Sequence, residues 1–157
     1  TELSILIEDQ SDVELNWLII NHGENHVILK VEMKGNASLS KLKVRIINET
    51  SEDRIDFICN GIVLKNTNDN ELLEDLKGLI TKDDKIKISP NMEVYTSEVM
   101  ANHLVTIGAF SKENLFYLTS KGLSEITAKK LLVMGFMQQV CDENLKKYIK
   151  MEVINIE

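Results

Sequence analysis

The sequence has few cysteines and no long hydrophobic run. Two cysteines, Cys59 and Cys141, are too few for a disulfide framework. The longest apolar runs, Trp17–Ile20 and Leu131–Met134, are far shorter than the roughly 18 residues that indicate a membrane span. Residues 1–10 lack the basic start and the apolar core of a signal peptide. These absences predict a protein that works outside the membrane, with the cytoplasm as its expected location.

Positive charge and catalytic motifs are also scarce. The chain has 18 Lys and Arg against 25 Asp and Glu, which gives a net charge of -7. A field of this sign disfavours binding to nucleic acid or to an anionic membrane. The sequence contains no G-x-S-x-G, no Walker A, no G-x-G-x-x-G after a strand and no H-E-x-x-H. We therefore expect neither a nucleic-acid-binding protein nor an autonomous enzyme.

Hydrophobic residues recur with period two from Ser4 to about Val105, which is typical of β-strands. The clearest apolar faces are Val27, Leu29, Val31 and Met33, then Leu42, Val44 and Ile46, then Ile55, Phe57 and Cys59. Turn-forming residues separate these runs at positions 21–25, 34–36, 48–53 and 66–70. The single proline, Pro90, is predicted to open the strand that contains residues 92–95, where a missing N–H does least damage.

After Gly108 the hydrophobic period becomes that of helices. Ser111 and Ser124 are the predicted N-caps of two helices, and Gly122 is predicted to end the first. The second helix has an apolar stripe that we expect to be buried, formed by Ala128, Leu131, Leu132, Gly135 and Phe136. A second apolar set, which we expect another molecule to cover, comprises Val133, Met134, Met137, Val140 and Cys141. Residues 142–151 are predicted to form a third short helix, and residues 152–156 a strand.

A chain of 157 residues is one domain's worth. Strands first and helices last argue for a β core, residues 1–108, with a helical segment, residues 109–157, packed on it. Alternation alone does not distinguish a sandwich from a parallel β-helix, because both have inward and outward positions on every strand.

The block from Pro90 to Phe136 carries a more specific signal. In order along the chain it reads Pro90-Asn91-Met92-Glu93-Val94, Asn102-His103, Thr106-Ile107-Gly108, Leu115-Phe116-Tyr117-Leu118 and Ser120-Lys121-Gly122. In this order and with these gaps it resembles the SufB/SufD family, the scaffold proteins of SUF iron–sulfur cluster assembly. Two positions depart from the family pattern: Lys121 replaces the usual Arg, and Leu104 follows the histidine where members have Gly or Glu.

The resemblance implies a mainly β fold, a right-handed parallel β-helix that is shortened relative to full family members and is followed by a C-terminal helical segment. It also implies a non-enzymatic scaffold or accessory subunit. Its expected partners are a SufC-like ABC ATPase and a SufB/SufD-like subunit or a second copy of the chain. We expect the ATPase to contact the spare face of the second helix, through Val133, Met134, Met137 and Val140.

His103 is the main candidate site residue and the candidate metal ligand. The matching histidine of the family lies at the subunit interface and is implicated in cluster building, and imidazole suits iron. The SufB branch uses a cysteine where this chain has Asp75. Any iron–sulfur cluster is therefore expected to be transient and shared with a partner. The competing interpretation of His103 is an ordinary histidine at a strand end.

Two other interpretations compete with the scaffold hypothesis or qualify it. His22, Glu24 and His26 are close in sequence, so the chain could be a small metal- or ligand-binding β protein unrelated to cluster assembly, although a plain turn explains the same residues. Asp75 in place of cysteine also fits a degenerate paralogue that only stabilises another scaffold. Cys59 is predicted to be a packed core thiol, and residues 115–118 to anchor the first helix on the β domain.

Overall fold

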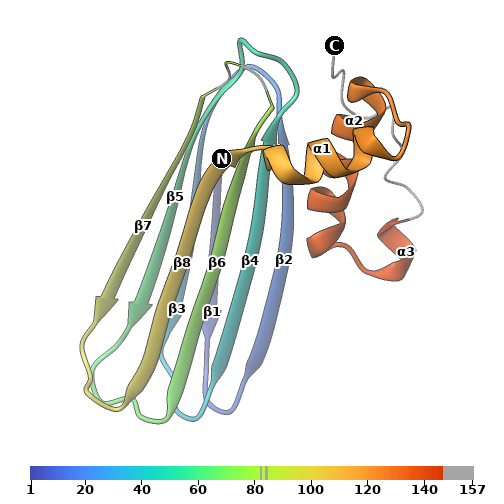
Figure 1. Ribbon diagram of the computed structural model, residues 1–157. Helices are drawn as coiled ribbons and strands as arrows, with labels where there is room; N and C mark the ends of the chain where they lie inside the picture. The colour runs from blue at the N-terminus through green and yellow to red at the C-terminus, as the bar shows by residue number, and fades with distance from the viewer. Residues whose placement is uncertain (82, 84, 147–157) are drawn as a thin grey trace.

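The computed structural model describes residues 1–81, 83 and 85–146, and these form a parallel β-helix with short helices beside it (Figure 1). The strands are β1 (Glu2–Ile7), β2 (Asp12–Asn21), β3 (Glu24–Met33), β4 (Leu39–Asn48), β5 (Arg54–Val63), β6 (Asn70–Ile80), β7 (Lys85–Val94) and β8 (Val99–Ala109). Odd strands form one sheet in the order β1-β3-β5-β7, and even strands form the other in the order β2-β4-β6-β8. All neighbours are parallel, so each turn of the chain adds one strand to each sheet. The predicted β-helix is confirmed.

Alternate residues of each strand point into the lumen between the two sheets. Inward side chains that are completely shielded from solvent are Leu29, Val31, Met33, Val44, Ile46, Phe57, Cys59, Leu72 and Leu76. The apolar faces predicted from period two therefore form the core. Burying one such large side chain stabilises a fold by about 1.5–3 kcal/mol. The lumen packing is thus the main source of stability.

Polar side chains stack from turn to turn at both ends of the strands. The Asn21 amide donates to the Asn48 side-chain oxygen at 2.8 Å. At the opposite corner, Asn36 N donates to Asp9 Oδ1 at 2.6 Å and Asn68 N donates to Asn36 Oδ1 at 3.0 Å. These hydrogen bonds satisfy backbone and amide groups that the bends would otherwise leave unpaired.

The turns that lead into β2, β4 and β6 repeat one backbone conformation, which the turn into β8 does not share. Gln10, Ala37 and Asp69 lie just before β2, β4 and β6, and their φ angles are 54°, 50° and 53°. Each residue adopts the left-handed conformation, which is unusual for residues other than glycine. The backbone conformation therefore repeats across these three turns, although the residue type at this position differs each time.

Pro90 lies inside β7 and not at the start of a strand, so the prediction of its position was wrong. It is paired with Cys59 of β5, and β7 is the last strand of its sheet in the described part of the chain. A proline is tolerated there because an edge strand has a side on which no ladder hydrogen bond is needed.

The helical segment consists of α1 (Lys112–Ser120), α2 (Glu125–Met137), the 3-10 turn η1 (Gln138–Val140) and α3 (Glu143–Lys146). Both predicted caps are confirmed: Ser111 Oγ accepts from Asn114 N, and Ser124 Oγ accepts from Thr127 N. Gly122 has a φ of 90° after α1, as predicted for a helix end. The remaining predictions, a helix extending to residue 151 and a strand at 152–156, lie outside the described residues. Of the helices described, none is long and apolar enough to cross a membrane.

The face of α2 that packs on the sheet is only partly the predicted one. Val133 and Met137 are buried against Ile47 and Leu79 of the even-numbered sheet. Of the predicted stripe, Ala128 is completely buried and Phe136 packs on this cluster, whereas Gly135 is exposed. Beside this contact the buried guanidinium of Arg45, on β4, donates from Nε to Gln139 Oε1 at 2.7 Å. The helix is apolar on most of its sides, so periodicity did not identify the side that faces the sheet. The expected spare face is an internal contact of this chain.

Candidate functional site at the open end of the β-helix

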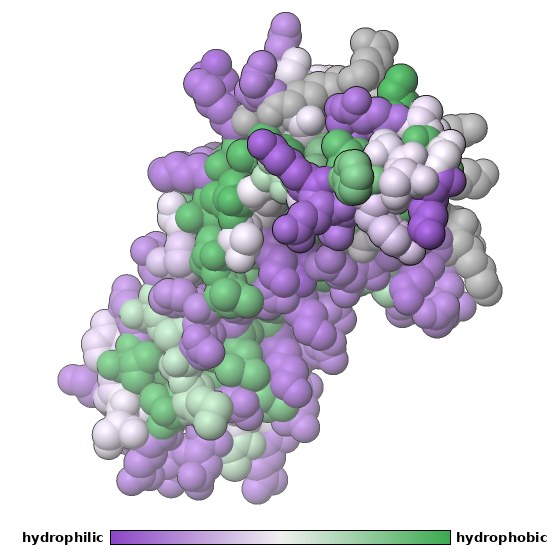
Figure 2. Space-filling model, in the orientation of Figure 1, coloured by the Kyte–Doolittle hydropathy of each residue, from purple (hydrophilic) through white to green (hydrophobic). Residues whose placement is uncertain are grey.

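The last turn of the β-helix, formed by β7 and β8, leaves both sheets with an edge. Within the described residues β8 pairs only with β6, and β7 only with β5. The exposed large apolar side chains of these strands and of the residue that follows β7 are Val94, Tyr95, Met100, Leu104 and Ile107. Figure 2 shows hydrophobic patches between hydrophilic surface along the strands on the face turned to the viewer. Exposed edges with apolar side chains are suited to pairing with strands of another chain.

His103 lies in the middle of β8, on the lumen side of the strand. It is in register with the inward-facing Glu74 of β6, and paired residues of parallel strands share one side of the sheet. Two residues further along β8, Val105 packs on the lumen core, as the alternation requires. His103 is nevertheless exposed, because no further turn covers it within the described residues. The predicted site residue is thus at the uncovered end of the lumen.

Directly below His103, Glu74 is a buried carboxyl group that the sequence analysis did not identify. Glu74 is only 3% exposed. Neither of its carboxylate oxygens has a hydrogen-bond partner among the described residues. Burial raises the pKa of Glu74 to about 7. A buried ionisable group at the end of a lumen is a functional candidate on physical grounds.

Cys59 lies across the lumen from Glu74 and is completely buried. Burial, and then the charge of Glu74, raises the pKa of the Cys59 thiol far above its usual range. The thiol therefore stays protonated near neutral pH, whereas metal ligation and nucleophilic attack require the thiolate. The prediction of a packed core thiol is confirmed.

Asp75, at the position expected for a family cysteine, faces away from the lumen. It is in register with Leu104 and not with His103. Asp75 Oδ2 accepts from Arg45 at 2.6 Å, and Oδ1 is 3.4 Å from the Lys77 ammonium. Burial alone would raise the pKa of Asp75, but Arg45 and Lys77 outweigh burial and hold it below its usual value. The residue is part of a structural ion pair that supports the helical segment through Arg45.

The donors at the open end do not fit a resident metal centre. In residues 1–81, 83 and 85–146, no three His, Cys, Asp or Glu side chains form a group that could hold a metal ion. The imidazole of His103 is accessible, but the Cys59 thiol is sealed in the core. Any iron or cluster handled here would be cargo that needs further ligands from another chain.

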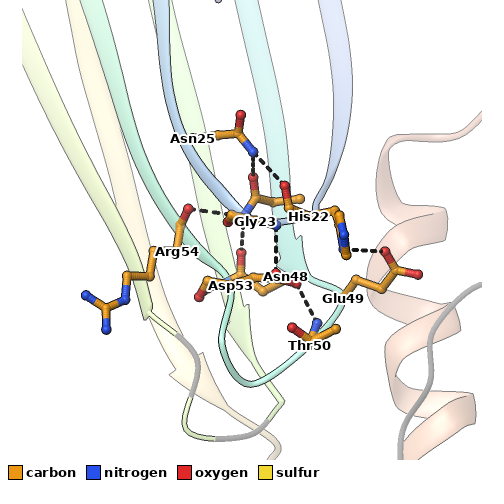
Figure 3. A network of polar contacts seen from close by, with 9 residues as sticks. His22, Gly23, Asn25, Asn48, Glu49, Thr50, Asp53 and Arg54 are labelled. Carbon is orange, nitrogen blue, oxygen red and sulfur yellow. Dashed lines mark hydrogen bonds and ion pairs between the residues drawn. The ribbon is translucent and has the colours of Figure 1, made fainter.

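The structure does not bring His22, Glu24 and His26 together into a site. His22 Nδ1 is 3.3 Å from Glu49, and His26 Nδ1 is 3.6 Å from Asp56. Figure 3 shows that the turn is held by hydrogen bonds, in which Asp53 accepts from Gly23 N and Thr50 N, and Asn25 donates to His22 O. These contacts favour the plain turn over the metal-binding alternative.

The residues predicted to contact an ATPase are mostly inaccessible. Val133, Met137 and Val140 are buried, and Met134 is half-buried. The expectation that they form a free surface was wrong, because α2 and η1 use them inside the chain.

The aromatic residues of α1 are unexpectedly exposed. Phe116 is 74% exposed and Tyr117 is 60% exposed, and Ile126 at the start of α2 is also exposed. Only Leu115 and Leu118 of the predicted anchor are half-buried. Among the described residues, the exposed large apolar side chains of the helical segment therefore lie on α1, on the first turn of α2 and, as Leu145, on α3, not at the end of α2.

The geometry defines a class of protein: a short parallel β-helix with an open end and a helical segment on its outer face. The family model described as "SUF system FeS cluster assembly, SufBD core domain" matches residues 2–136. The chain therefore belongs to the SufBD family. The resemblance found in the sequence is confirmed.

The curated relatives that the chain matches are longer proteins. It is 30% identical to the iron-sulfur cluster assembly protein SufD of Escherichia coli over 87 residues, which are 53% of this chain and 19% of SufD. It is 27% identical to a SufBD family protein of Pyrococcus horikoshii over 164 residues, covering 90% of this chain and 33% of that protein. A SufBD family protein of Mycobacterium leprae is 44% identical over 52 residues, 32% of this chain and 13% of the relative. The chain spans a third or less of the length of these relatives.

Proposed function

We propose that this chain is a non-enzymatic component of iron–sulfur cluster assembly, a scaffold or accessory subunit that acts in the cytoplasm together with other SUF proteins. Membership of the SufBD family over residues 2–136 supports involvement in this process. The observation that carries the proposal is the position of His103, on the lumen side of the uncovered last strand. There the exposed imidazole could bind iron or a cluster that a second chain holds.

The open end supports the choice of partner. The unpaired edges of β7 and β8 and their apolar side chains fit a SufB/SufD-like subunit or a second copy of this chain. Pairing there would place His103 at the seam between two lumens. Because the chain offers no accessible thiolate at this end, the partner would supply the sulfur ligands of a transient cluster.

Replacing His103 with alanine is expected to lower cluster formation at least about tenfold, as for the loss of a residue that supports a metal site. The measurement is anaerobic reconstitution with iron and sulfide in the presence of a SufB/SufD-like partner, followed by visible absorption. His26→Ala is the matched control, because His26 is exposed and lies on β3, in the sheet that does not contain β8. Equal cluster yield from wild type and His103→Ala would contradict the role of His103. A stable complex that never holds a cluster would identify an accessory subunit.

Docking of a SufC-like ATPase is proposed at the aromatic surface of α1. Phe116, Tyr117 and Ile126 are the exposed large apolar residues of α1 and the start of α2. Aromatic side chains supply much of the binding energy where proteins associate. ATP hydrolysis by the partner would then move the helical segment, and this movement would reach the sheet through the contact of Arg45 with Gln139.

The double variant Phe116→Glu, Tyr117→Glu is expected to weaken binding of a SufC-like ATPase at least about tenfold. Both side chains are exposed, so the thermal unfolding midpoint should stay close to that of the wild type. Affinity is measured by titration calorimetry or by pull-down with quantified input. The control is Asn114→Glu, a charge change on an exposed polar residue of the same helix. Wild-type affinity in the double variant would exclude this surface as the docking site.

A further inference from the structure

The lumen is shaped around the carboxyl group of Glu74. Gly61 lies across from it on β5, and a Cβ atom on Gly61 would stand 2.7 Å from Glu74 Oε1 and 2.8 Å from Leu72. The absence of a side chain at Gly61 thus provides the space that the carboxyl group fills. This arrangement holds the carboxyl group in one place within the turn formed by β5 and β6, directly before the last turn of the β-helix.

This carboxyl group still needs a hydrogen-bond partner. Leaving a buried polar group unpaired is costly, and native proteins rarely do so without a functional reason. The protonated thiol of Cys59 is only a weak donor. The lumen-facing side chains of the covering turn are otherwise apolar: Ile86, Ile88, Pro90, Met92, Val99 and Val105. Among the inward residues of this turn that the structure describes, His103 is the one strong hydrogen-bonding side chain.

Register places the two groups on neighbouring strands. Glu74 and His103 are directly paired across the parallel ladder of β6 and β8. Neighbouring strands lie about 4.8 Å apart, so side chains of paired residues on one face are within reach of each other.

We propose that Glu74 is a positioning residue for His103: a carboxylate oxygen of Glu74 accepts a hydrogen bond from one ring N–H of His103 and leaves the other ring nitrogen facing the open end. A carboxylate behind an imidazole fixes its tautomer and orientation and increases its strength as a ligand. The inference deepens the proposed function, since that function determines what the outward nitrogen would bind. The pairing itself requires neither cargo nor partner.

The test is the ring tautomer of His103, measured by 15N–1H correlation on 15N-labelled protein at pH 8, where imidazole is ordinarily neutral. In the wild type the ratio of the two tautomers should differ at least about fivefold from that of histidine in an unstructured peptide, as one hydrogen bond implies. Glu74→Gln keeps an oxygen acceptor and should keep this difference. Glu74→Leu fills the same apolar space without an acceptor and should reduce the difference to less than about twofold.

Two controls separate pairing from a general change in structure. Glu71→Leu alters a carboxyl group on the opposite face of the same strand and should leave the His103 ring signals unchanged. The signals of His22 and His26 should be the same in all variants, since neither residue lies on β6 or β8. A wild-type ring signal in Glu74→Leu, or no tautomer preference in the wild type, would overturn the proposal. Because the measurement uses the chain alone, its failure would leave the His103→Ala reconstitution result standing, and the reverse also holds.

Discussion

Replacing Gly35 with alanine is expected to lower the free energy of unfolding by at least about 3 kcal/mol, the upper range for overpacked sites. Gly35 lies in the turn after β3, where its N–H donates to Ile7 O at 3.2 Å. A Cβ atom there would stand 2.0 Å from Asp9 N and 2.2 Å from Glu8 C. Both atoms belong to the backbone of the turn below, so no side-chain movement can relieve the overlap. Urea denaturation followed by circular dichroism measures the change.

Two other glycines provide matched controls for Gly35→Ala. A Cβ atom added to Gly108, in β8, or to Gly135, in α2, would meet no atom within 4 Å, and neither glycine has a positive φ. Gly135→Ala should stabilise the protein by about 0.5–1 kcal/mol, because alanine is the better helix former. Gly108→Ala should be close to neutral. Wild-type stability in Gly35→Ala would contradict the close stacking of the first two turns.

The lumen core was predictable from the sequence, whereas the arrangement of the strands was not. Period two marks the inward side chains of a strand whatever its neighbours are, so the faces around Leu29, Val44 and Phe57 were found directly. Which strands pair depends on the turns. Gln10, Ala37 and Asp69 adopt the same left-handed conformation with three different residue types, so the repeat is not visible in the letters. Only the resemblance to the SufB/SufD family pointed to a β-helix.

The candidate site was predictable in part. His103 was found through the resemblance, but Glu74 was missed although it stands between Leu72 and Leu76 on an inward alternation, where a charged residue is unexpected. The surface of the helical segment was misassigned for a physical reason. An apolar helix has several faces that could pack on a sheet, and the choice depends on neighbours such as Ile47 and Leu79, which are remote in sequence.

Raising the pH from about 5 to 8 is expected to lower the free energy of unfolding by up to about 3 kcal/mol through Glu74 alone. Burial raises the pKa of this carboxyl group from 4.5 to about 7 in the folded protein. Between these two values the folded state keeps a proton that the unfolded state has lost, so each rise in pH favours unfolding. Below pH 4.5 both states are protonated and above about pH 7 both are ionised, so the loss is confined to this window.

The decisive comparison is the pH dependence of urea unfolding in the wild type, Glu74→Gln and Glu71→Gln. Glutamine at position 74 has the shape of the protonated carboxyl group and does not titrate, so its stability should fall less steeply between about pH 5 and 7 than that of the wild type. Glu71 lies on the outer face of the same strand, and its replacement should leave the wild-type slope unchanged. Taking the difference between variants cancels the contributions of all other titrating groups, provided that they are independent of position 74. Parallel curves for the wild type and Glu74→Gln would show that the pKa of Glu74 is not raised in the folded protein, either because water reaches the lumen at its level or because the hydrogen bond from His103 offsets burial.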